Sequence, residues 1–294
     1  GTSRLGRVED GTSVADFEED ERARRISINT ALVACEYAGV KINLLDTPGF
    51  TDFVGEVKSA IRVADAAIII VDAVAGVEVG TQLVWEFCEE HRLPRFVVIN
   101  KMDRDNANYT SALASVQQLA VDKKLVPAQL PWGEKAEFKG IIGLLSEQAR
   151  KGVGTEEEEI PDDLSEIAAE ARVALEEAAA EGDDDLLLKY LDGQPLNQDE
   201  IKTGFKKAVL AGTFVPVFLA SSTSEIGIDP ILQGIIRYLP SPDEQSHVSA
   251  EGIAGIEEVD ISDAGPLGVY AFKTTADPYV GKLTYLRVMS GMLD

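Results

Sequence analysis

Three apolar runs, separated by segments of helical spacing, constrain the fold of this chain most strongly. Residues 42–45, 67–71 and 96–99 are mainly apolar, while residues 54–64 and 80–91 between them carry apolar side chains at helical intervals. That spacing predicts amphipathic helices. The second and third runs do not alternate with polar residues, as is typical of strands buried on both faces. The order strand, helix, strand, helix, strand predicts the α/β class, with a parallel sheet covered on both faces.

The rest of the chain extends this alternation. A β-hairpin is expected around Gly39, because Val33, Cys35 and Tyr37 alternate with smaller or polar residues before it. The acidic run 16–21 is expected to be a mobile loop. Helical patterns and one further apolar strand follow along the chain: helices at 109–125, 161–181, 183–190, 198–211 and 231–239, and the last strand of the sheet at 215–219.

Changes in composition suggest the domain boundaries. Short strands broken by Pro and Gly, and then acidic, alanine-rich helices, occupy residues 128–210, which we expect to be an α+β subdomain inserted into the main domain. The main domain then comprises residues 1–127 and 211–242. A stretch rich in Pro, Ser and Gly, residues 243–265, is expected to be a linker. The β-patterned residues 266–294 are expected to begin a β-barrel.

Charge and cysteine usage limit the partners and the compartment. The chain carries 27 Lys and Arg against 51 Asp and Glu, a net charge of −24, which argues against broad contact with nucleic-acid phosphate. A basic protein partner, or nucleic acid reached through a small local patch, stays possible. Cys35 and Cys88 have no metal-ligand spacing and suit a reducing cytosol. No apolar run approaches about 18 residues, so we expect a cytoplasmic chain without membrane or DNA contact.

The polar residues that follow the third run predict a nucleotide site. Asn100, Lys101 and Asp103 stand at the carboxyl end of a buried strand, where open α/β sheets bind ligands. The Asp103 carboxylate can accept both N1–H and N2–H of guanine, Lys101 can lie along the base and ribose, and Asn100 can tie neighbouring loops together. The alternative is a solvated loop. The sequence DTPG upstream favours guanine binding.

Three further loops carry candidate ligand contacts. Asp46 can hold a cation through water, and Gly49 lets a backbone N–H approach a phosphate closely. Ser221 and Ser222 follow the strand at 215–219 and can place a backbone N–H and a hydroxyl beside the guanine O6. Ser27 could complete a Mg²⁺ shell beside a γ-phosphate. Taken alone, Ser27 is more simply explained as a serine that begins a strand.

Together these motifs resemble the translational GTPases, and they are most similar to bacterial elongation factor G and its paralogues. The resemblance runs over essentially the whole chain and also includes the sequences GRVEDGTSVADFEEDE, FKGIIGLL, KYLDG, IIRYLPSPDE and FKTTADPYVGKLTYLRVMSG. It implies a P-loop-type GTPase fold in which the main domain is the G domain, the insertion is the G′ subdomain, and residues 266–294 begin domain II.

The resemblance also implies a function. GTP or GDP and Mg²⁺ are the expected ligands, with Ser27 and, through water, Asp46 on the metal. The full-length protein is expected to be a GTP hydrolase, monomeric and cytoplasmic, that couples hydrolysis to translocation in protein synthesis. Its expected partner is the ribosome, through stalk proteins and ribosomal RNA.

This sequence departs from the family pattern in three places. The family begins with a P-loop, GxxxxGK[ST], which is not found here, so the resemblance implies a fragment cut at both ends. Residues 1–294 alone are therefore expected to bind nucleotide poorly and not to hydrolyse it usefully. Phe50 takes the place of the catalytic histidine, and a phenyl ring cannot position water through a hydrogen bond. In switch I, RRISI replaces RGITI, which puts Arg25 in place of a glycine and Ser27 in place of a threonine.

Phe50 keeps several functions open. A translocase of elongation factor G type is one hypothesis. A GTP-responsive ribosome-binding module, controlled by nucleotide state and with slow or no hydrolysis, is the second. A ribosomal protection factor shares the same G domain. An α/β domain outside this family would need several motifs to occur in order by coincidence.

Overall fold

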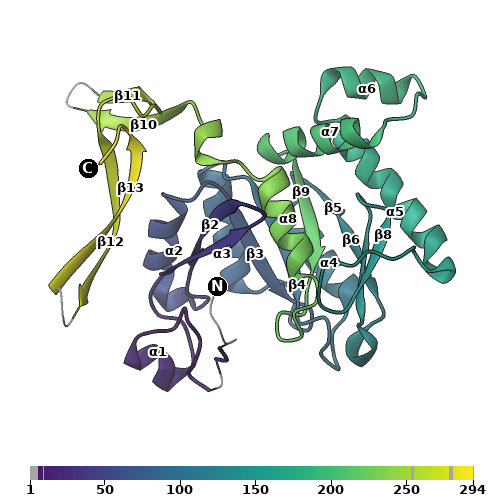
Figure 1. Cartoon of the computed structure of the whole chain (residues 1–294), viewed down its shortest axis with the longest axis horizontal. Helices are drawn as coiled ribbons and strands as arrows, with labels where there is room; N and C mark the ends of the chain where they lie inside the picture. The colour runs from purple at the N-terminus through teal and green to yellow at the C-terminus, as the bar shows by residue number, and fades with distance from the viewer. Residues whose placement is uncertain (1–5, 9, 253–254, 278–280, 294) are drawn as a thin grey trace. The chain divides into compact units, whose positions relative to one another are not determined.

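The computed structural model describes residues 6–8, 10–252, 255–277 and 281–293. Some expectations fall outside the described residues. They concern residues 1–5 of the expected G domain, residue 9 before switch I, residues 253–254 of the expected linker, and residues 278–280 and 294 of the expected domain II. The chain divides into two compact units, Gly1–Asp65 with Pro240–Asp294, and Ala66–Leu239 (Figure 1).

A four-stranded parallel sheet forms the centre of the unit Ala66–Leu239. Its strand order is β3 (Ala67–Asp72), β4 (Arg95–Asn100), β9 (Phe214–Leu219) and β5 (Lys124–Pro127). Every residue of β9 is buried, and all but the last residue of β4 are buried. Burial on both faces explains why these strands read as continuous apolar runs.

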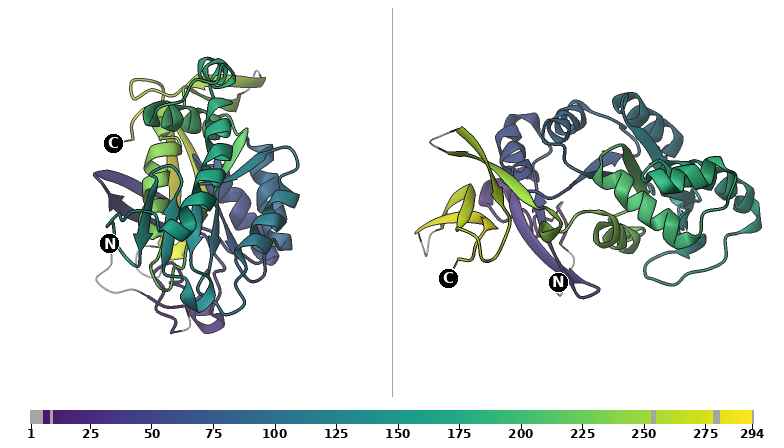
Figure 2. Two further views of the ribbon diagram at one scale, coloured as in Figure 1. Left: turned by 90° about the vertical axis from the view of Figure 1, so that its right-hand side faces the viewer. Right: turned by 90° about the horizontal axis from the view of Figure 1, so that it is seen from above.

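Helices cover both faces of this sheet, which confirms the α/β fold class. On one face, Phe96 and Phe218 share a core cluster with α7 (Gln198–Leu210) and α8 (Ile228–Tyr238). Figure 1 and the two views of Figure 2 show α8 lying over the strands. Two other helices contact the sheet outside that cluster, α3 (Val79–Glu90) against β3 and α4 (Tyr109–Leu119) against β4.

The prediction of one helix over residues 109–125 is wrong at its end. Helix α4 stops at Leu119, and the chain returns as β5, which pairs with β9 along the whole of its length. This pairing satisfies the backbone of β5 and buries Val126 beside the core. A four-residue strand that gains its partner only from a segment about 90 residues away carries no local pattern that separates it from a helix end.

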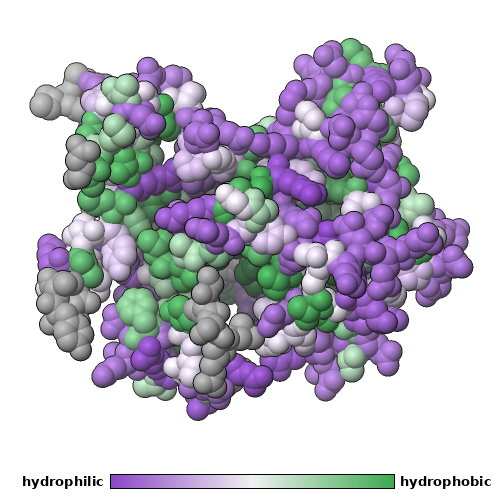
Figure 3. All heavy atoms as spheres, in the orientation of Figure 1, coloured by the Kyte–Doolittle hydropathy of each residue, from purple (hydrophilic) through white to green (hydrophobic). Residues whose placement is uncertain are grey.

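The residues expected as the inserted subdomain hold a three-stranded antiparallel sheet and three helices, of which α5 and α6 are acidic. The strands, in the order β6, β7, β8, are Gln129–Trp132, Gly140–Gly143 and Gln148–Lys151, and the helices are α5 (Asp162–Ala180), α6 (Asp184–Leu191) and α7. The 3₁₀ turn η2 (Lys135–Glu137) lies between β6 and β7. The surface over α5 and α6 is mainly hydrophilic on the face shown in Figure 3. The predicted boundaries of this subdomain stay a prediction.

Caps and close packing fix these helices. The Asp183 side chain accepts the N–H groups of Asp185 and Leu186 at the start of α6, and Asn197 forms a capping box with Glu200 at the start of α7. Gly204 of α7 lies against α5 so closely that an added Cβ would be 2.1 Å from the Ala179 carbonyl oxygen. The alanine-rich pattern of α5 therefore serves helix contact as well as helix propensity.

The other unit begins with a hairpin that confirms the expectation for Gly39. Strand β1 (Ala31–Tyr37) pairs antiparallel with β2 (Val40–Asp46), and both turn residues, Ala38 and Gly39, have positive φ, as two-residue hairpin turns require. The expectation that residues 42–45 join the parallel sheet is wrong, because β2 pairs with β1 in a sheet of two strands. The turn chemistry around Gly39 gave β2 an antiparallel partner next to it in sequence.

One loop expectation also needs correction. The acidic run 16–21 is not entirely loop, since α1 (Glu19–Arg24) starts within it, stabilised by three acids in its first turn and a capping box between Glu18 and Glu21. The expected linker contains a short 3₁₀ turn, η3 (Pro242–Glu244), and a hairpin of β10 (His247–Gly252) with β11 (Gly255–Asp260). Val248 and Val259 face each other across that hairpin, a pairing too short to stand out in a polar segment.

A third hairpin, β12 (Gly268–Asp277) with β13 (Gly281–Ser290), occupies the residues expected to begin a barrel. It packs in the same unit against α2 (Val54–Ile61), which follows the 3₁₀ turn η1 (Thr51–Phe53). Lys273 donates to the Thr30 carbonyl oxygen, and Arg287 pairs with Asp65 at 2.5 Å. Among the described residues, no helix has the length and apolar character needed to span a membrane.

Candidate functional site

The carboxyl ends of β4 and β9 bring four predicted site residues together. Asn100 ends β4 and Lys101 follows it, while Ser221 and Ser222 come after β9, the parallel neighbour of β4. Parallel neighbours end at the same edge of a sheet, so the loops meet there. The buried Met102 ties them through its N–H, which donates to the Ala220 carbonyl oxygen at 3.2 Å.

Asn100 joins the two loops through its side chain, as its position predicts. Its Oδ1 accepts the Ser222 N–H at 3.0 Å and lies 2.8 Å from the Ser222 hydroxyl. Its Nδ2 lies 2.6 Å from the same hydroxyl. The amide therefore fixes the loop after β9 relative to the loop after β4, and with it the position of Ser221.

Asp103 presents an acceptor with nothing bound to it. Its Oδ2 accepts the Ser224 hydroxyl at 3.0 Å, whereas its Oδ1 is buried and has no hydrogen-bond partner among the described residues. The Ser221 hydroxyl is likewise buried without a partner there. Since buried polar atoms in proteins are almost always paired, these two atoms suit a polar ligand.

The charge state of Asp103 suits a ligand with N–H donors. Partial burial raises the pKa of the Asp103 carboxyl, but the hydroxyls of Ser221 and Ser224 lower it more, so the pKa lies below its usual value. The Ser221 hydroxyl therefore lies close to the Asp103 carboxylate, although the contact between them falls short of a regular hydrogen bond. Asp103 is thus ionised at neutral pH, and guanine N1–H and N2–H match its open acceptor.

Lys101 has a partner that the sequence analysis did not identify. Its Nζ lies 2.6 Å from Oδ2 of Asp72, the last residue of β3. Partial burial raises the pKa of Asp72, but Lys101 and the Val74 N–H lower it more, so the net pKa is below its usual value. Spacing alone could not assign this contact, because Asp72 and Lys101 are 29 residues apart and meet only where two parallel strands end side by side.

The loop after β2 carries Gly49 and Phe50 in the other unit. An added Cβ on Gly49 would meet no atom within 4 Å, and its φ is not left-handed. No contact within the described residues requires glycine here, so close approach of a ligand stays the predicted reason. Phe50 is 55% exposed and directly precedes η1.

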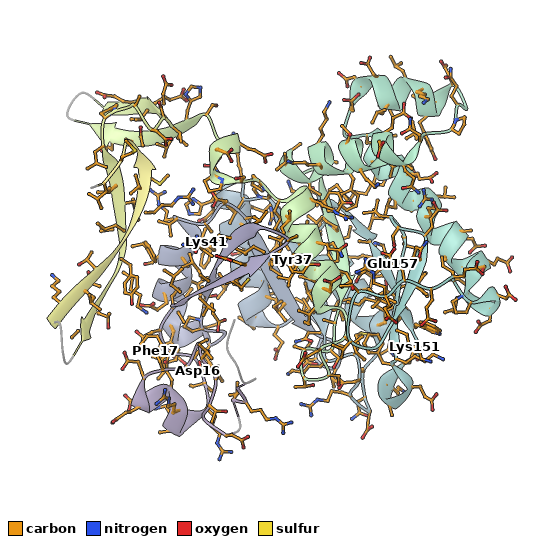
Figure 4. The ribbon with its side chains drawn as sticks, viewed as in Figure 1. Asp16, Phe17, Tyr37, Lys41, Lys151 and Glu157 are labelled. Atoms are coloured by element: carbon orange, nitrogen blue, oxygen red, sulfur yellow. The ribbon has the colours of Figure 1, made fainter. Side chains whose placement is uncertain are left out.

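Ser27 and Asp46 both lie near an acidic pair in this unit. The Ser27 hydroxyl donates to Oδ1 of the buried Asp16 at 2.8 Å. Figure 4 labels Asp16 beside α1. The pKa of Asp46 is raised, first by lost hydration and then by the charges of Asp16 and Glu21. Part of the Asp46 side chain is exposed, so water screens this effect.

The donor set in this unit does not by itself form a metal site. In the part of the chain that the structure describes, no three His, Cys, Asp or Glu side chains are grouped to hold an ion. Mg²⁺ often keeps several waters and binds phosphate oxygens with one or two protein ligands, so Ser27 and Asp46 fit only that mode. To bind the ion, the Ser27 hydroxyl would have to give up its hydrogen bond to Asp16.

The switch I motif adopts a conformation that glycine would favour. Arg25, which stands where the family pattern has glycine, has φ 58° and ends α1 in the left-handed region. A non-glycine residue there costs roughly 1 kcal/mol. The expected loss of backbone freedom at this position thus appears as strain in Arg25.

Glu21 holds the residues that follow Arg25. Its buried carboxylate accepts the N–H groups of Ile28 at 3.0 Å, Asn29 at 2.9 Å and Glu18 at 3.1 Å. We expect Glu21→Ala to destabilise this loop by about 1–3 kcal/mol, because three backbone donors lose their acceptor. Amide hydrogen exchange at Ile28 and Asn29 should become about 10-fold faster or more.

The exposed Glu19 of the same helix provides the control. Glu19→Ala removes the same atoms without removing an acceptor from Ile28 or Asn29, and should leave their exchange unchanged. Equal acceleration by both substitutions would show that helix α1, and not the Glu21 carboxylate, protects the loop.

Comparison with known proteins identifies the family. The sequence pattern of the family described as "Elongation factor Tu GTP binding domain" matches residues 2–241. The crystal structure of a protein from Thermus thermophilus has 34% sequence identity and a TM-score of 0.86, and the match covers 99% of this chain but 41% of that protein. The chain thus spans about two fifths of that protein's length. It belongs to the elongation factor Tu GTP-binding domain family, which confirms its resemblance to the translational GTPases.

Proposed function

We propose that this chain is part of a ribosome-associated GTPase of elongation factor G type, which binds GTP with Mg²⁺ and couples hydrolysis to translocation in protein synthesis. The observation that carries the guanine assignment is the pair of buried oxygens, Asp103 Oδ1 and Ser221 Oγ, which have no hydrogen-bond partner within the described part of the chain and lie beside the Asn100–Ser222 contact. The inserted helices and sheet between β5 and β9 support the elongation factor G type, because the motifs FKGIIGLL and KYLDG lie in them.

Named residues of this chain would hold the nucleotide. Asp103, Lys101 and Asn100 would bind and orient guanine, with Ser221 and Ser222 at its O6. Asp46, Gly49 and Ser27 would face the phosphates and Mg²⁺. The bond to be hydrolysed would be the one between the β- and γ-phosphates of GTP. Because guanine would donate its hydrogen bonds to a charged acceptor, the site would reject adenine strongly.

The remaining assignments follow from the same proposal. The ribosome, through stalk proteins and ribosomal RNA, is the proposed partner of a cytoplasmic monomer. With a net charge of −24, residues 1–294 would contact basic ribosomal proteins more readily than RNA phosphate. Neither DNA nor a membrane is proposed as a partner.

Phe50 favours a second candidate function. Its ring is exposed but cannot hydrogen-bond a water, so the nucleotide state could control ribosome attachment with slow or no hydrolysis. A ribosomal protection factor would also fit that description. GTP turnover by the full-length protein, measured with and without ribosomes, separates these functions. Rapid ribosome-stimulated turnover would support the translocase, tight binding without turnover would support the binding module, and absence of guanine-nucleotide binding would contradict both.

A substitution at Phe50 tests its role in hydrolysis. In the full-length protein, Phe50→His should raise ribosome-stimulated GTP turnover about 10-fold or more, because an imidazole can position and polarise the attacking water. Phe50→Leu is the matched control, since it also removes the ring but adds no hydrogen-bonding group. Equal turnover by the two variants would mean that residue 50 does not limit hydrolysis.

A further inference from the structure

The Lys101–Asp72 ion pair is built into the ends of two neighbouring strands. Asp72 lies opposite Asn100 in the β3–β4 register, so its carboxylate starts one strand away from Lys101. The Lys101 Nζ is 2.6 Å from Asp72 Oδ2. The Asp72 side chain is 23% exposed and the Lys101 side chain 49% exposed, so solvent screens the pair only partly.

The backbone holds Asp72 independently of Lys101. Its Oδ1 accepts the Val74 N–H at 2.8 Å, and its carbonyl oxygen accepts the Gly76 N–H at 2.8 Å. Ala73 donates to the Asn100 carbonyl oxygen at 2.9 Å and accepts the Asn108 N–H at 2.9 Å. These hydrogen bonds hold the Asp72 carboxylate in place at the end of the strand. In the ion pair it is therefore the flexible Lys101 side chain that loses conformational freedom.

Lys101 itself needs such support. Its backbone has φ 62°, a left-handed conformation that is costly for a side chain with a Cβ. Its side chain borders an open hollow of about 390 Å³ lined by Asp72, Val74, Arg104, Asp105 and Asn106, where a lysine without a partner would sample many rotamers. Ordering a long side chain at the moment of binding lowers affinity, so ordering it beforehand raises affinity.

We propose that Asp72 is a positioning residue of the nucleotide site, which holds the Lys101 ammonium so that the lysine stem is ready to lie along guanine and ribose. This inference rests on the proposed guanine-binding function. Asp72 does not touch the nucleotide. Asp72 acts on nucleotide binding by attracting the Lys101 ammonium. This action depends on the negative charge of Asp72 and not on the hydrogen bond that its Oδ1 accepts from the Val74 N–H.

Two substitutions of Asp72 in the full-length protein separate charge from turn. Asp72→Asn keeps an acceptor for the Val74 N–H and removes the charge, and should weaken GDP binding about fivefold. Asp72→Glu keeps the charge within reach of Lys101 but alters the turn, and should bind GDP within about twofold of the unsubstituted protein. The measurement is isothermal titration with GDP, accompanied by thermal unfolding of each variant.

Lys101→Met supplies the second arm of the test. In that background Asp72→Asn should change GDP affinity no further, because the ammonium that it orders is gone. Unchanged or tighter GDP binding by Asp72→Asn alone would overturn the inference, as would equal weakening by Asn and Glu. If the unsubstituted full-length protein does not bind GDP, the proposed function fails first and this inference fails with it.

Discussion

Asp103→Asn in the full-length protein is expected to weaken GDP binding about 100-fold and to strengthen binding of xanthosine diphosphate. A hydrogen bond to a charged group contributes roughly 1.5–3 kcal/mol, which is about 10- to 150-fold in affinity. The amide turns one carboxylate acceptor into a donor that faces a guanine N–H. Xanthine carries a carbonyl oxygen where guanine carries its amino group, so it can accept from that amide.

The neighbouring Asp105 provides a matched control for this substitution. Asp105 is exposed in the same loop, so Asp105→Asn changes the net charge equally without reaching the buried Oδ1 of Asp103. It should leave GDP affinity within about twofold, since water screens the charge of an exposed carboxylate. Equal losses for the two variants would show that the loop acts through its overall charge, and base recognition by Asp103 would be contradicted.

Phe205→Ala is expected to lower the free energy of unfolding of the unit Ala66–Leu239 by about 3–5 kcal/mol. Phe205 is fully buried, and its ring centroid lies 4.9 Å from that of Phe214 and 4.5 Å from that of Tyr238. It therefore joins α7 to β9 and α8, and its removal opens a cavity under all three. A loss of this size is a large part of the stability of a typical domain.

Urea denaturation of the 294-residue chain measures this effect. Both tryptophans, Trp85 and Trp132, lie in this unit, so their fluorescence reports its unfolding. Leu188→Ala is the control, because Leu188 is 63% exposed on α6 and should change stability by about 0.5 kcal/mol or less. A Phe205→Ala midpoint equal to that of Leu188→Ala would mean that this aromatic cluster does not hold the unit together.

The strands and helices with strong periodicity could be predicted from the sequence, because their pattern is local. Helix α3 and strands β3, β4 and β9 were expected close to their observed bounds. The short strand β5 was not, since its pairing with β9 crosses the whole insertion. Helix α1 was missed because acidic residues suggest a solvated loop, whereas here they cap and stabilise one helical turn.

The candidate site shows the same division. The residue types of the NKMD and DTPG loops suffice to predict a guanine nucleotide and its chemical contacts, because donors, acceptors and charge belong to the side chains themselves. Asp72 and Ser224 could not be assigned to these contacts from spacing, since they reach Lys101 and Asp103 only across neighbouring strands and loops. Likewise, only the structure shows that the Ser27 hydroxyl is bound to Asp16.

The sequence by itself determined the α/β class, the family and the chemical nature of the predicted ligand, because hydrophobic periodicity and residue chemistry are carried by the residues alone. Tertiary structure decided which oxygens lack a hydrogen-bond partner and which side chains already have an ion-pair or hydrogen-bond partner. Asp103 Oδ1 has no hydrogen-bond partner in the part of the chain that the structure describes, while Lys101 is paired. Such outcomes depend on parallel strands ending side by side, and only the fold brings together residues that are far apart in the chain.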